Sequence, residues 1–219
     1  MSRWKMVLGS LAMPGIAGAV YFASAGQWDL PVAWALLGVL TVLCVVVALT
    51  ADRDLVRERI KPGPGNHDHV TRPLALVMIL AHWIIAGLDV GRLHWSVIPR
   101  DVQLAGLVGY AVAMAFLFWA VRTNPFYSSV VRVQNDRGHQ VVEAGPYRFV
   151  RHPGYAATLA GVFVGGLALG SWLAMPPLAV LGVFFLRRTF LEDRMLIAEL
   201  PGYAEYASRV RYRLVVGVV

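Results

Sequence analysis

Four long stretches with few or no charged side chains limit the fold of this chain more than any other feature of its sequence. Met6–Trp28, Leu30–Ala51 and Val102–Val121 contain no charged residue, and Pro73–Leu88 is shorter, with His82 as its single ionisable residue. About 20 apolar residues in an α-helix suffice to cross a bilayer. The sequence therefore predicts four membrane-spanning helices.

The composition supports an all-α, polytopic membrane bundle. Hydrophobic residues make up 58% of the 219 residues and charged residues 15%, whereas about 25% of the residues of a soluble domain are charged. The net charge of +7 is typical of a membrane protein whose Lys and Arg collect in cytoplasmic loops. Because the sequence also lacks any nucleic-acid-binding motif, nucleic acid is not an expected partner.

A further uncharged run, from Pro153 to Leu186, is too long for a single crossing. As one helix it would extend about 50 Å at 1.5 Å per residue, and it is interrupted by Gly170-Ser171 and Pro176-Pro177. A proline inside a helix removes a backbone hydrogen bond. We therefore predict two short helices folded as a hairpin, Tyr155–Leu169 and Trp172–Arg188.

The basic residues predict the orientation of the bundle. If the N-terminus is cytoplasmic, 18 of the 20 Lys and Arg residues lie on the cytoplasmic side, and only Arg92 and Arg100 lie outside. Such an excess follows the positive-inside rule. The rule supports the hairpin as well, because a single final span would send the basic tail to the other side. Both termini are therefore predicted to be cytoplasmic.

Two regions follow from this topology. Residues 1–121 hold the four spans, with a cytoplasmic loop at 51–72, and residues 122–219 form the predicted catalytic region. The second region divides into a loop (122–154), the helical hairpin (155–188) and a cytoplasmic tail (189–219). In the tail, apolar residues recur at helical spacing as far as a break at Pro201-Gly202.

The segment His139–Tyr155, HQVVEAGPYRFVRHPGY, brings many conformationally special and aromatic residues together. A plain loop does not require this composition. Because His152 precedes a proline, α geometry is disfavoured there, and its carbonyl is predicted to face a ligand rather than a helix partner. Pro153 suits the first position of the next helix. This segment is the candidate site.

The string GPYRFVRHPGY, the later Arg188 with Glu192-Asp193, and the closing GYAEYASRVRYR resemble the isoprenylcysteine carboxyl methyltransferase family, which is related to phospholipid methyltransferases. The resemblance covers Asn124 to Arg213. Upstream, ERIKPGPG, GLDVGRLHWS and NPFYSS resemble bacterial members of unspecified substrate, which implies a bacterial cytoplasmic membrane. Family members usually have Glu-Glu and a final Pro-Gly turn, where this chain has Glu192-Asp193 and Val216-Gly217.

The resemblance implies a methyltransferase that holds S-adenosylmethionine between the membrane and the cytoplasmic tail, with a lipophilic acceptor entering from the bilayer. Matching by motif assigns the cofactor pocket to His139, Gly145, Tyr147, His152, Pro153, Tyr155, Arg188, Glu192 and Asp193. The same matching assigns the acceptor to Arg151, Tyr203, Tyr206 and Arg209. Asn124 and Arg132 are further candidates for the pocket, and no metal ligand is expected.

Methyl transfer is an in-line displacement, which requires the acceptor about 3–3.5 Å from the methyl carbon and the exclusion of water. A carboxylate or thiolate acceptor needs an orienting cation, for which Arg151 and Arg209 are candidates as bidentate donors. An amine acceptor needs a base instead, for which Glu192 is the candidate. A prenylated cysteine carboxylate, a lipid headgroup, a small thiol and an isoprenoid acid all remain open.

Simpler explanations exist for the same residues. Arg148 and Arg151 would also suit anchors at anionic lipid headgroups, and the acidic pair 192–193 would suit a solvated helix face. Tyr203 and Tyr206 would suit an aromatic belt at the membrane interface.

Residues outside the C-terminal half give weaker signals. His67 and His69 have no third ligand in view for a metal ion. Asp89 lies near a span, and we expect it to pair with Arg92 at the outer interface rather than to serve a proton path.

Two other classes of function are open. Some sterol reductases resemble this C-terminal architecture, and the arginines here would bind the phosphate of their nicotinamide cofactor. A non-enzymatic carrier would place polar residues mid-membrane in several helices, and the predicted spans contain few. The oligomeric state is not predicted.

Overall fold

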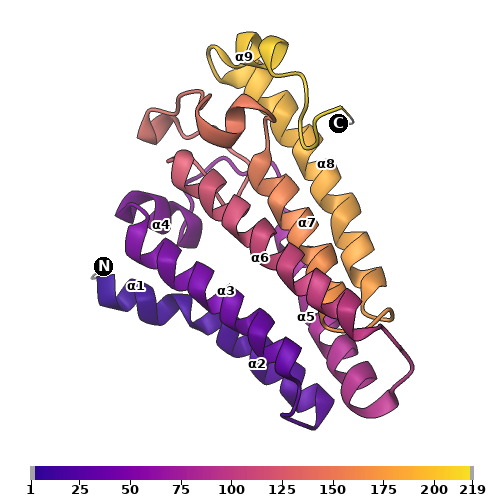
Figure 1. The fold of residues 1–219 in the computed structure, drawn as a ribbon. Coiled ribbons are helices and arrows are strands. Elements are labelled where there is room, and N and C mark those ends of the chain that lie inside the picture. The colour runs from indigo at the N-terminus through magenta and orange to yellow at the C-terminus, as the bar shows by residue number, and fades with distance from the viewer. Residues whose placement is uncertain (1–2, 218–219) are drawn as a thin grey trace.

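The computed structural model describes residues 3–217 of the chain, and over these residues every regular element is a helix. Figure 1 shows the helices running roughly alongside one another, with the loops and short helices gathered at the two ends. The α-helices are α1 (Arg3–Ser10), α2 (Ala12–Ala25), α3 (Pro31–Thr50), α4 (Arg53–Ile60), α5 (Thr71–Leu88), α6 (Arg100–Thr123), α7 (Pro153–Ala168), α8 (Met175–Glu199) and α9 (Tyr203–Arg209).

The predicted polytopic helical bundle is confirmed. Four helical segments are long and apolar enough to cross a membrane, and they correspond to the four predicted spans. They are Arg3–Ala25, Pro31–Thr50, Thr71–Leu93 and Arg100–Thr123. The chain is therefore a multi-pass membrane protein.

Two of these spans are irregular. The first breaks at Leu11, between α1 and α2. Pro14 explains the break because it has no N–H and its ring crowds the carbonyl of Ser10, four residues earlier. The third continues from α5 into a short π-helix at Asp89–Leu93.

The predicted hairpin is present, with α7 and α8 as its two helices. The turn between them contains Gly170, whose φ of +85° lies in the left-handed region that glycine tolerates. Pro176 and Pro177 lie in the first turn of α8, where their missing N–H groups cost little. However, α8 does not end near Arg188 as predicted. It runs without interruption to Glu199, so the acidic pair lies on the same helix as the apolar half of the hairpin.

The bundle core is built mainly by α2, α3, α5, α6 and α7. Glycines on α7 allow close packing: a Cβ at Gly161 would lie 2.6 Å from Met114 on α6. A separate, smaller core joins α8 to α9, where Leu196, Tyr203 and Tyr206 pack together. The C-terminal helices thus have an apolar centre of their own beyond the bundle.

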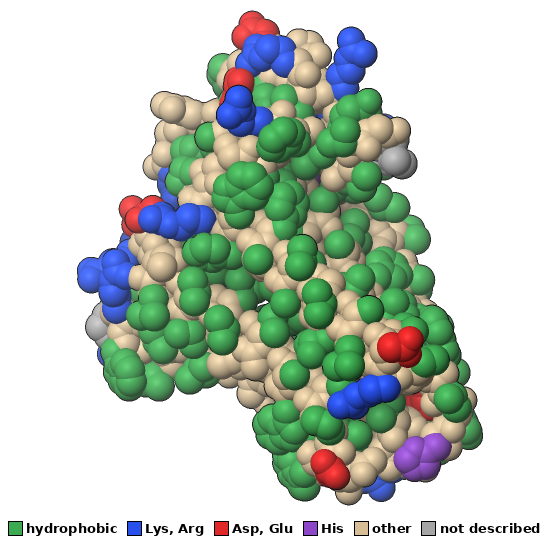
Figure 2. Space-filling view, in the orientation of Figure 1, with side chains coloured by type: hydrophobic (Ala, Val, Ile, Leu, Met, Phe, Trp, Pro, Cys, Tyr) green, Lys and Arg blue, Asp and Glu red, His purple; other side chains and the backbone are tan. Residues whose placement is uncertain are grey.

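The polar segments cluster at one end of the bundle. Figure 1 shows α4, the segment between α6 and α7, and α9 at the same end, above the apolar helices. Figure 2 shows many of the charged side chains of this face at that end, with hydrophobic side chains covering most of the middle. This arrangement is the one that the predicted topology requires of the loops 51–72 and 122–154 and the tail.

At the opposite end, the predicted pair between Asp89 and Arg92 does not form. Asp89 is buried and accepts hydrogen bonds from Ser96, Ser171 and the backbone of Trp95. Arg92 donates instead to carbonyls at the end of α2, through Nε to Ser24 at 2.7 Å. Asp89 therefore ties the α5–α6 connection to the α7–α8 turn, and Arg92 caps α2, where a cation suits the helix dipole.

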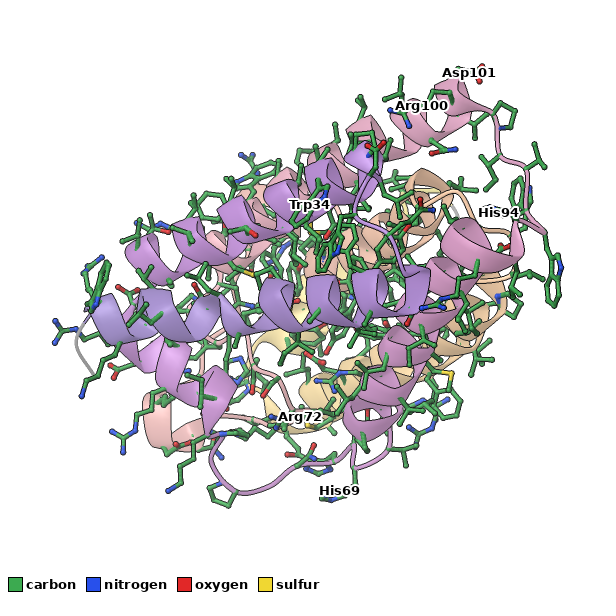
Figure 3. The ribbon with its side chains drawn as sticks, turned by 90° about the horizontal axis from the view of Figure 1, so that it is seen from below. Trp34, His69, Arg72, His94, Arg100 and Asp101 are labelled. Atoms are coloured by element: carbon green, nitrogen blue, oxygen red, sulfur yellow. The ribbon has the colours of Figure 1, made fainter. Side chains whose placement is uncertain are left out.

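Figure 3 views the molecule from below. Arg100 and Asp101 project away from the bundle at the start of α6, and His94 lies near the same end. His69 and Arg72 lie at a different edge, beside the start of α5. The charged residues around α5 and α6 thus occupy the ends of these helices.

Candidate active site

A polar hollow opens between the α6–α7 segment and the C-terminal helices. It encloses about 680 Å³, including space that is open to solvent. Its lining comes from three places: the segment 124–142, the start of α7 with the residues before it, and the helices α8 and α9. Residues that are far apart in the sequence therefore share one cavity.

The floor of the hollow is tied to α4, in the connection between α3 and α5, by a buried ion pair. Arg132 donates to both carboxylate oxygens of Glu58 on α4, at 2.9 and 2.8 Å, and its third nitrogen reaches Asp136 at 2.8 Å. The hydroxyl of Ser128 also donates to Glu58 at 2.8 Å. Burial would raise the pKa of Glu58, but the hydrogen bonds from Arg132 and Ser128 hold it below its usual range. The segment 128–136 is thus fixed by α4.

Arg151 and Asp193 form the central ion pair of the site. Nε and Nη2 of Arg151 donate to the two oxygens of Asp193, each at 2.8 Å, and Arg213 adds a bond of 2.9 Å. The remaining nitrogen of Arg151 donates to three backbone carbonyls, those of Ala207, Val210 and Arg211. Arg151 is buried and its donors are taken, so it is neither a headgroup anchor nor a free cation.

The same contacts hold the C-terminal tail against the site. The backbone N–H groups of Arg151 and His152 donate to the carbonyls of Tyr212 and Arg213, at 2.9 and 2.8 Å. As predicted, His152 lies outside α geometry, with φ −124° and ψ 60°. Its carbonyl, however, accepts from Tyr155 and Ala156, both at 3.1 Å. The prediction that this carbonyl faces a ligand is therefore wrong, because it accepts the first hydrogen bonds of α7.

A chain of polar contacts leads from the hollow to the start of α5. The Tyr155 hydroxyl donates to Glu192, which lines the hollow, and accepts from Nε of Arg188 at 2.8 Å. Nη1 of Arg188 lies 3.6 Å from Asp68, which is buried ahead of α5 and accepts from the backbone of Val70 and Thr71. Arg188 is also buried. It acts behind Tyr155 rather than at the surface of the hollow.

Three tyrosines form one wall of the hollow: Tyr147, and Tyr203 and Tyr206 of α9. Tyr203 donates to Asp193 at 3.0 Å, and Tyr206 donates to the carbonyl of Tyr147 at 2.7 Å. Burial, together with the Asp193 carboxylate, raises the pKa of Tyr203 above its usual range. Since Tyr203 and Tyr206 are buried, neither belongs to an interfacial aromatic belt. Asn124 donates to the hydroxyl of Tyr147 at 3.2 Å and so links this wall to the end of α6.

The imidazole of His139 lines the hollow and is uncharged at pH 7. Its Nδ1 accepts from the backbone N–H of Gln134 at 3.2 Å, and its ring lies over Phe126 at 4.5 Å between centroids. Burial, with repulsion from Arg132 and Arg137, lowers its pKa to about 4. The ring is therefore held as an uncharged surface.

Gly154 brings Tyr127 close to α7. A Cβ added at Gly154 would lie 2.5 Å from Cε2 of Tyr127, closer than two carbons can approach without a shift. Tyr127 and Gly154 both line the hollow, and the guanidinium of Arg59 on α4 lies 5.0 Å from the Tyr127 ring. Glycine at this position thus sets the width of the hollow.

One stretch of the lining exposes unpaired backbone groups. Gln140, Val141 and Val142 have no regular structure and line the hollow. Over the described part of the chain, their N–H and C=O groups make no hydrogen bond with other residues. Polar backbone groups of this kind need a partner, which water or a ligand supplies.

The predicted site residues divide into two groups. The hollow is lined by His139, Tyr147, Arg151, His152, Tyr155, Glu192, Tyr203 and Tyr206, and by Asn124 and Arg132. The others lie behind the lining or away from it: Gly145, Pro153, Arg188, Asp193 and Arg209.

Arg188 lies behind Tyr155, as described above, and the other four residues also have defined contacts. Gly145 has φ +56°, with Trp119 and Thr123 at its back, and Pro153 opens α7 as predicted. Asp193 supports Arg151 and Tyr203 from behind. Arg209 is exposed and pairs with Glu143 at 2.6 Å.

Sequence reasoning did not find Glu58, Asp68 or Tyr127. Glu58 is the single acidic residue in the basic string RERIK, and Tyr127 lies in NPFYSS, so each had a local signal. Asp68 had none, because its partners Arg187 and Arg188 come more than 100 residues later.

The segment that builds much of this hollow is also the part of the chain that matches a known family. Residues 105–198 match the isoprenylcysteine carboxyl methyltransferase (ICMT) family. The resemblance predicted from the sequence is thereby confirmed over most of α6, the segment between α6 and α7, all of α7 and nearly all of α8. The ICMT match includes Arg151, His152, Tyr155, Glu192 and Asp193. Helix α9 and the tail that closes on Arg151 follow the matched residues.

One curated relative extends the likeness. The cobalt-zinc-cadmium resistance protein CzcN of Cupriavidus metallidurans is 26% identical over 136 residues. The aligned part covers 60% of this chain and 58% of CzcN, so the chain spans less than two thirds of that relative. Within residues 3–217, no group of three or more His, Cys, Asp or Glu side chains is placed to hold a metal ion.

Proposed function

We propose that the protein is an S-adenosylmethionine-dependent methyltransferase that acts on a lipophilic acceptor at the membrane. The observation that carries the proposal is the hollow itself. Its lining combines aromatic rings, the carboxylate of Glu192 and the backbone groups of residues 140–142. The ICMT match to the same segment supports the reaction class. The proposal includes the predicted orientation, with this end of the bundle in the cytoplasm.

The lining fits the chemical groups of the cofactor. A sulfonium is a cation, and cations bind aromatic rings. The rings of Tyr127, Tyr147 and Tyr155 line the hollow. Hydroxyl and ammonium groups need acceptors, for which Glu192 is available. A purine edge needs both donors and acceptors, and the backbone of residues 140–142 offers them. When bound, the cofactor supplies an electrophilic methyl group.

Glu192 is the residue to which we assign the proton chemistry. It lines the hollow and is held by the Tyr155 hydroxyl, which is in turn held by Arg188. Neither predicted orienting cation is free in the hollow, because Arg151 is bound to Asp193 and Arg209 pairs with Glu143. The arrangement favours the amine branch of the predicted chemistry, with Glu192 as base.

A nicotinamide-dependent reductase fits this lining less well. A dinucleotide phosphate needs a free cation, but Arg132 and Arg151, the two arginines that line the hollow, are already bound to Glu58 and Asp193. Thermal stabilisation by reduced dinucleotide, compared with that by S-adenosylmethionine, separates the two proposals. We retain the methyltransferase.

Calorimetry on protein in lipid nanodiscs tests the proposal. We expect saturable binding of S-adenosylhomocysteine, weakened in the variant Glu192→Gln. Glu205→Gln is the matched control because Glu205 is exposed on α9 and does not line the hollow. Absence of binding at millimolar ligand by folded protein would refute the cofactor assignment.

The acceptor requires a separate experiment. Incubation of the protein with native membrane lipids and S-adenosylmethionine labelled in the methyl group should yield a labelled lipid-soluble product, which mass spectrometry identifies. Label that stays entirely in water-soluble products would overturn the assignment of a lipophilic acceptor.

A further inference from the structure

A second, apolar cavity lies inside the bundle, separate from the polar hollow. It has a volume of about 780 Å³ including open space, and no residue lines both cavities. Side chains from α2, α3, α5, α6, α7 and α8 surround it. Its lining is almost entirely hydrophobic, which suits a lipid-like ligand rather than a solute from water.

The cavity is elongated along the bundle. On α7 its lining runs from Thr158 to Gly165, with Leu169 just past the end of the helix, and on α6 from Tyr110 to Leu117. The eleven steps from Thr158 to Leu169 rise about 16 Å at 1.5 Å per residue. Gly161 and Gly165 both belong to the lining, and Met114 and Tyr110 of α6 pack closely against them. The shape therefore suits a chain more than a compact ring system.

Polar atoms without partners lie toward the end of the cavity that is farther from the polar hollow. His82 donates through Nδ1 to the carbonyl of Ala174 at 2.9 Å. The neutral ring then offers Nε2 as an acceptor. In the part of the chain that the structure describes, Nε2 of His82, the hydroxyl of Tyr110 and the indole N–H of Trp83 make no hydrogen bond. His82, Trp83 and Tyr110 are each more than nine-tenths buried.

His82 and Tyr110 approach α7 at the same level. A Cβ at Gly165 would lie 3.0 Å from Cδ2 of Tyr110, and one at Gly166 would lie 3.4 Å from Cε1 of His82. The fourth polar residue of the lining, Thr158, is already satisfied because it donates to Gly154 at 2.8 Å. An acceptor and a donor without partners thus belong to the lining of one apolar cavity, beside neighbouring residues of α7.

We propose that this cavity binds a single-chain lipophilic alcohol, with its hydroxyl at His82 and Tyr110. The alcohol donates its proton to Nε2 of His82 and accepts from the Tyr110 hydroxyl. Its apolar chain extends through the cavity past Met114 and Val162 toward Thr158. A hydrocarbon without the hydroxyl leaves both polar groups buried and unpaired, which is unfavourable in a membrane interior.

This inference does not depend on methyl transfer. Gly166, beside His82, is 12 residues beyond Gly154, which corresponds to about 18 Å along α7. The hydroxyl is therefore held far from the polar hollow and is not the group to be methylated. The site recognises a ligand by an oxygen remote from the proposed reaction.

Photo-crosslinking tests the proposal on the full chain in phosphatidylcholine nanodiscs. The probes are 1-hexadecanol with a mid-chain diazirine and the same diazirine chain without the hydroxyl. Mass spectrometry then locates the labelled residues. We expect the alcohol to label cavity-lining residues of α6 and α7, such as Met114 and Val162, and the hydrocarbon to label them less.

The variants Tyr110→Phe and His82→Leu decide the role of the hydroxyl. We expect each to lower cavity labelling by the alcohol roughly fivefold to tenfold, the effect of one hydrogen bond, while labelling by the hydrocarbon does not fall. Val112→Leu, on the lipid-exposed side of α6, should change neither. Equal labelling by the two probes, labelling unaffected by Tyr110→Phe, or labelling confined to lipid-facing residues would each overturn the proposal.

Discussion

Arg151 grips Asp193 through two parallel hydrogen bonds, each 2.8 Å long. One partner comes from the loop before α7 and the other from the far half of α8, and both side chains are buried. The remaining donors of Arg151 hold the carbonyls of the tail. This single pair therefore joins three segments, and it makes Arg151 a structural cross-link of the site.

Replacing Arg151 with Met should strongly destabilise the C-terminal region. The change leaves Asp193 buried without its main partner, a loss of about 3–5 kcal/mol for a buried pair. Unfolding of the purified protein in mixed micelles measures it. Arg209→Met, which breaks the exposed pair with Glu143, is the control and should change little. Similar stabilities for the two variants would contradict the structural role of Arg151.

Glu58→Gln should loosen the segment 128–136. Arg132 then loses its buried carboxylate, whereas its second partner, Asp136, is exposed. We expect faster amide hydrogen exchange over Val130–Gln134 and weaker binding of S-adenosylhomocysteine. Asp136→Asn acts on the same arginine and serves as the control. If it loosened the segment as much as Glu58→Gln does, the importance of the buried contact would be disproved.

His139 should make the protein less stable as pH falls from about 6.5 to about 4. Its pKa is about 4 in the folded protein, against about 6.5 in an unfolded chain. Between these values the unfolded chain takes up a proton that the folded protein does not, so unfolding becomes easier as pH falls. Below about pH 4 this contribution is constant.

Thermal unfolding at several pH values tests this dependence. His139→Gln should reduce the loss of stability between pH 6.5 and 4.5, while His69→Gln, in an exposed loop, should leave it unchanged. Equal slopes for the native protein and His139→Gln would show that the ring is not held neutral. Stability lost only below pH 4 belongs instead to carboxylates such as Asp193, whose pKa the contacts with His152 and Arg151 hold below its usual range in spite of burial.

Gly154→Ala should weaken cofactor binding more than it affects folding. The added methyl group forces Tyr127 out of its place against α7, while alanine itself favours a helix by up to about 1 kcal/mol relative to glycine. Gly182→Ala on α8 is the control, since its Cβ would meet Phe163 only at an ordinary 3.5 Å. Unchanged affinity for S-adenosylhomocysteine in Gly154→Ala would remove Tyr127 from the proposed site.

The spans could be predicted from the sequence because apolar length is a local property. Each predicted run returned as a helix, and the turn residues at Gly170 and Pro201-Gly202 marked real breaks. The extent of α8 could not be predicted in this way. After Arg188 its sequence becomes charged, and hydropathy does not distinguish a polar continuation of a helix from the start of a separate tail.

Motifs located the site but not the partners of its residues. Arg151 and Asp193 were both found, yet their pairing depends on how α8 passes the loop before α7. Glu58 on α4 precedes its partner Arg132 by 74 residues, and Asp68, in the loop before α5, precedes Arg187 by 119. Contacts at such separations leave no trace in local composition, and for the same reason Arg209 was placed in the site although it faces solvent.

The unbroken course of α8 has a mechanical consequence. Its apolar half packs against α5 and α7, while Glu192 and Asp193 lie further along the same rigid rod. When a bilayer becomes thinner or thicker, its helices respond by tilting, and a tilt of α8 moves both carboxylates together. The geometry of the hollow therefore depends on the thickness of the surrounding bilayer.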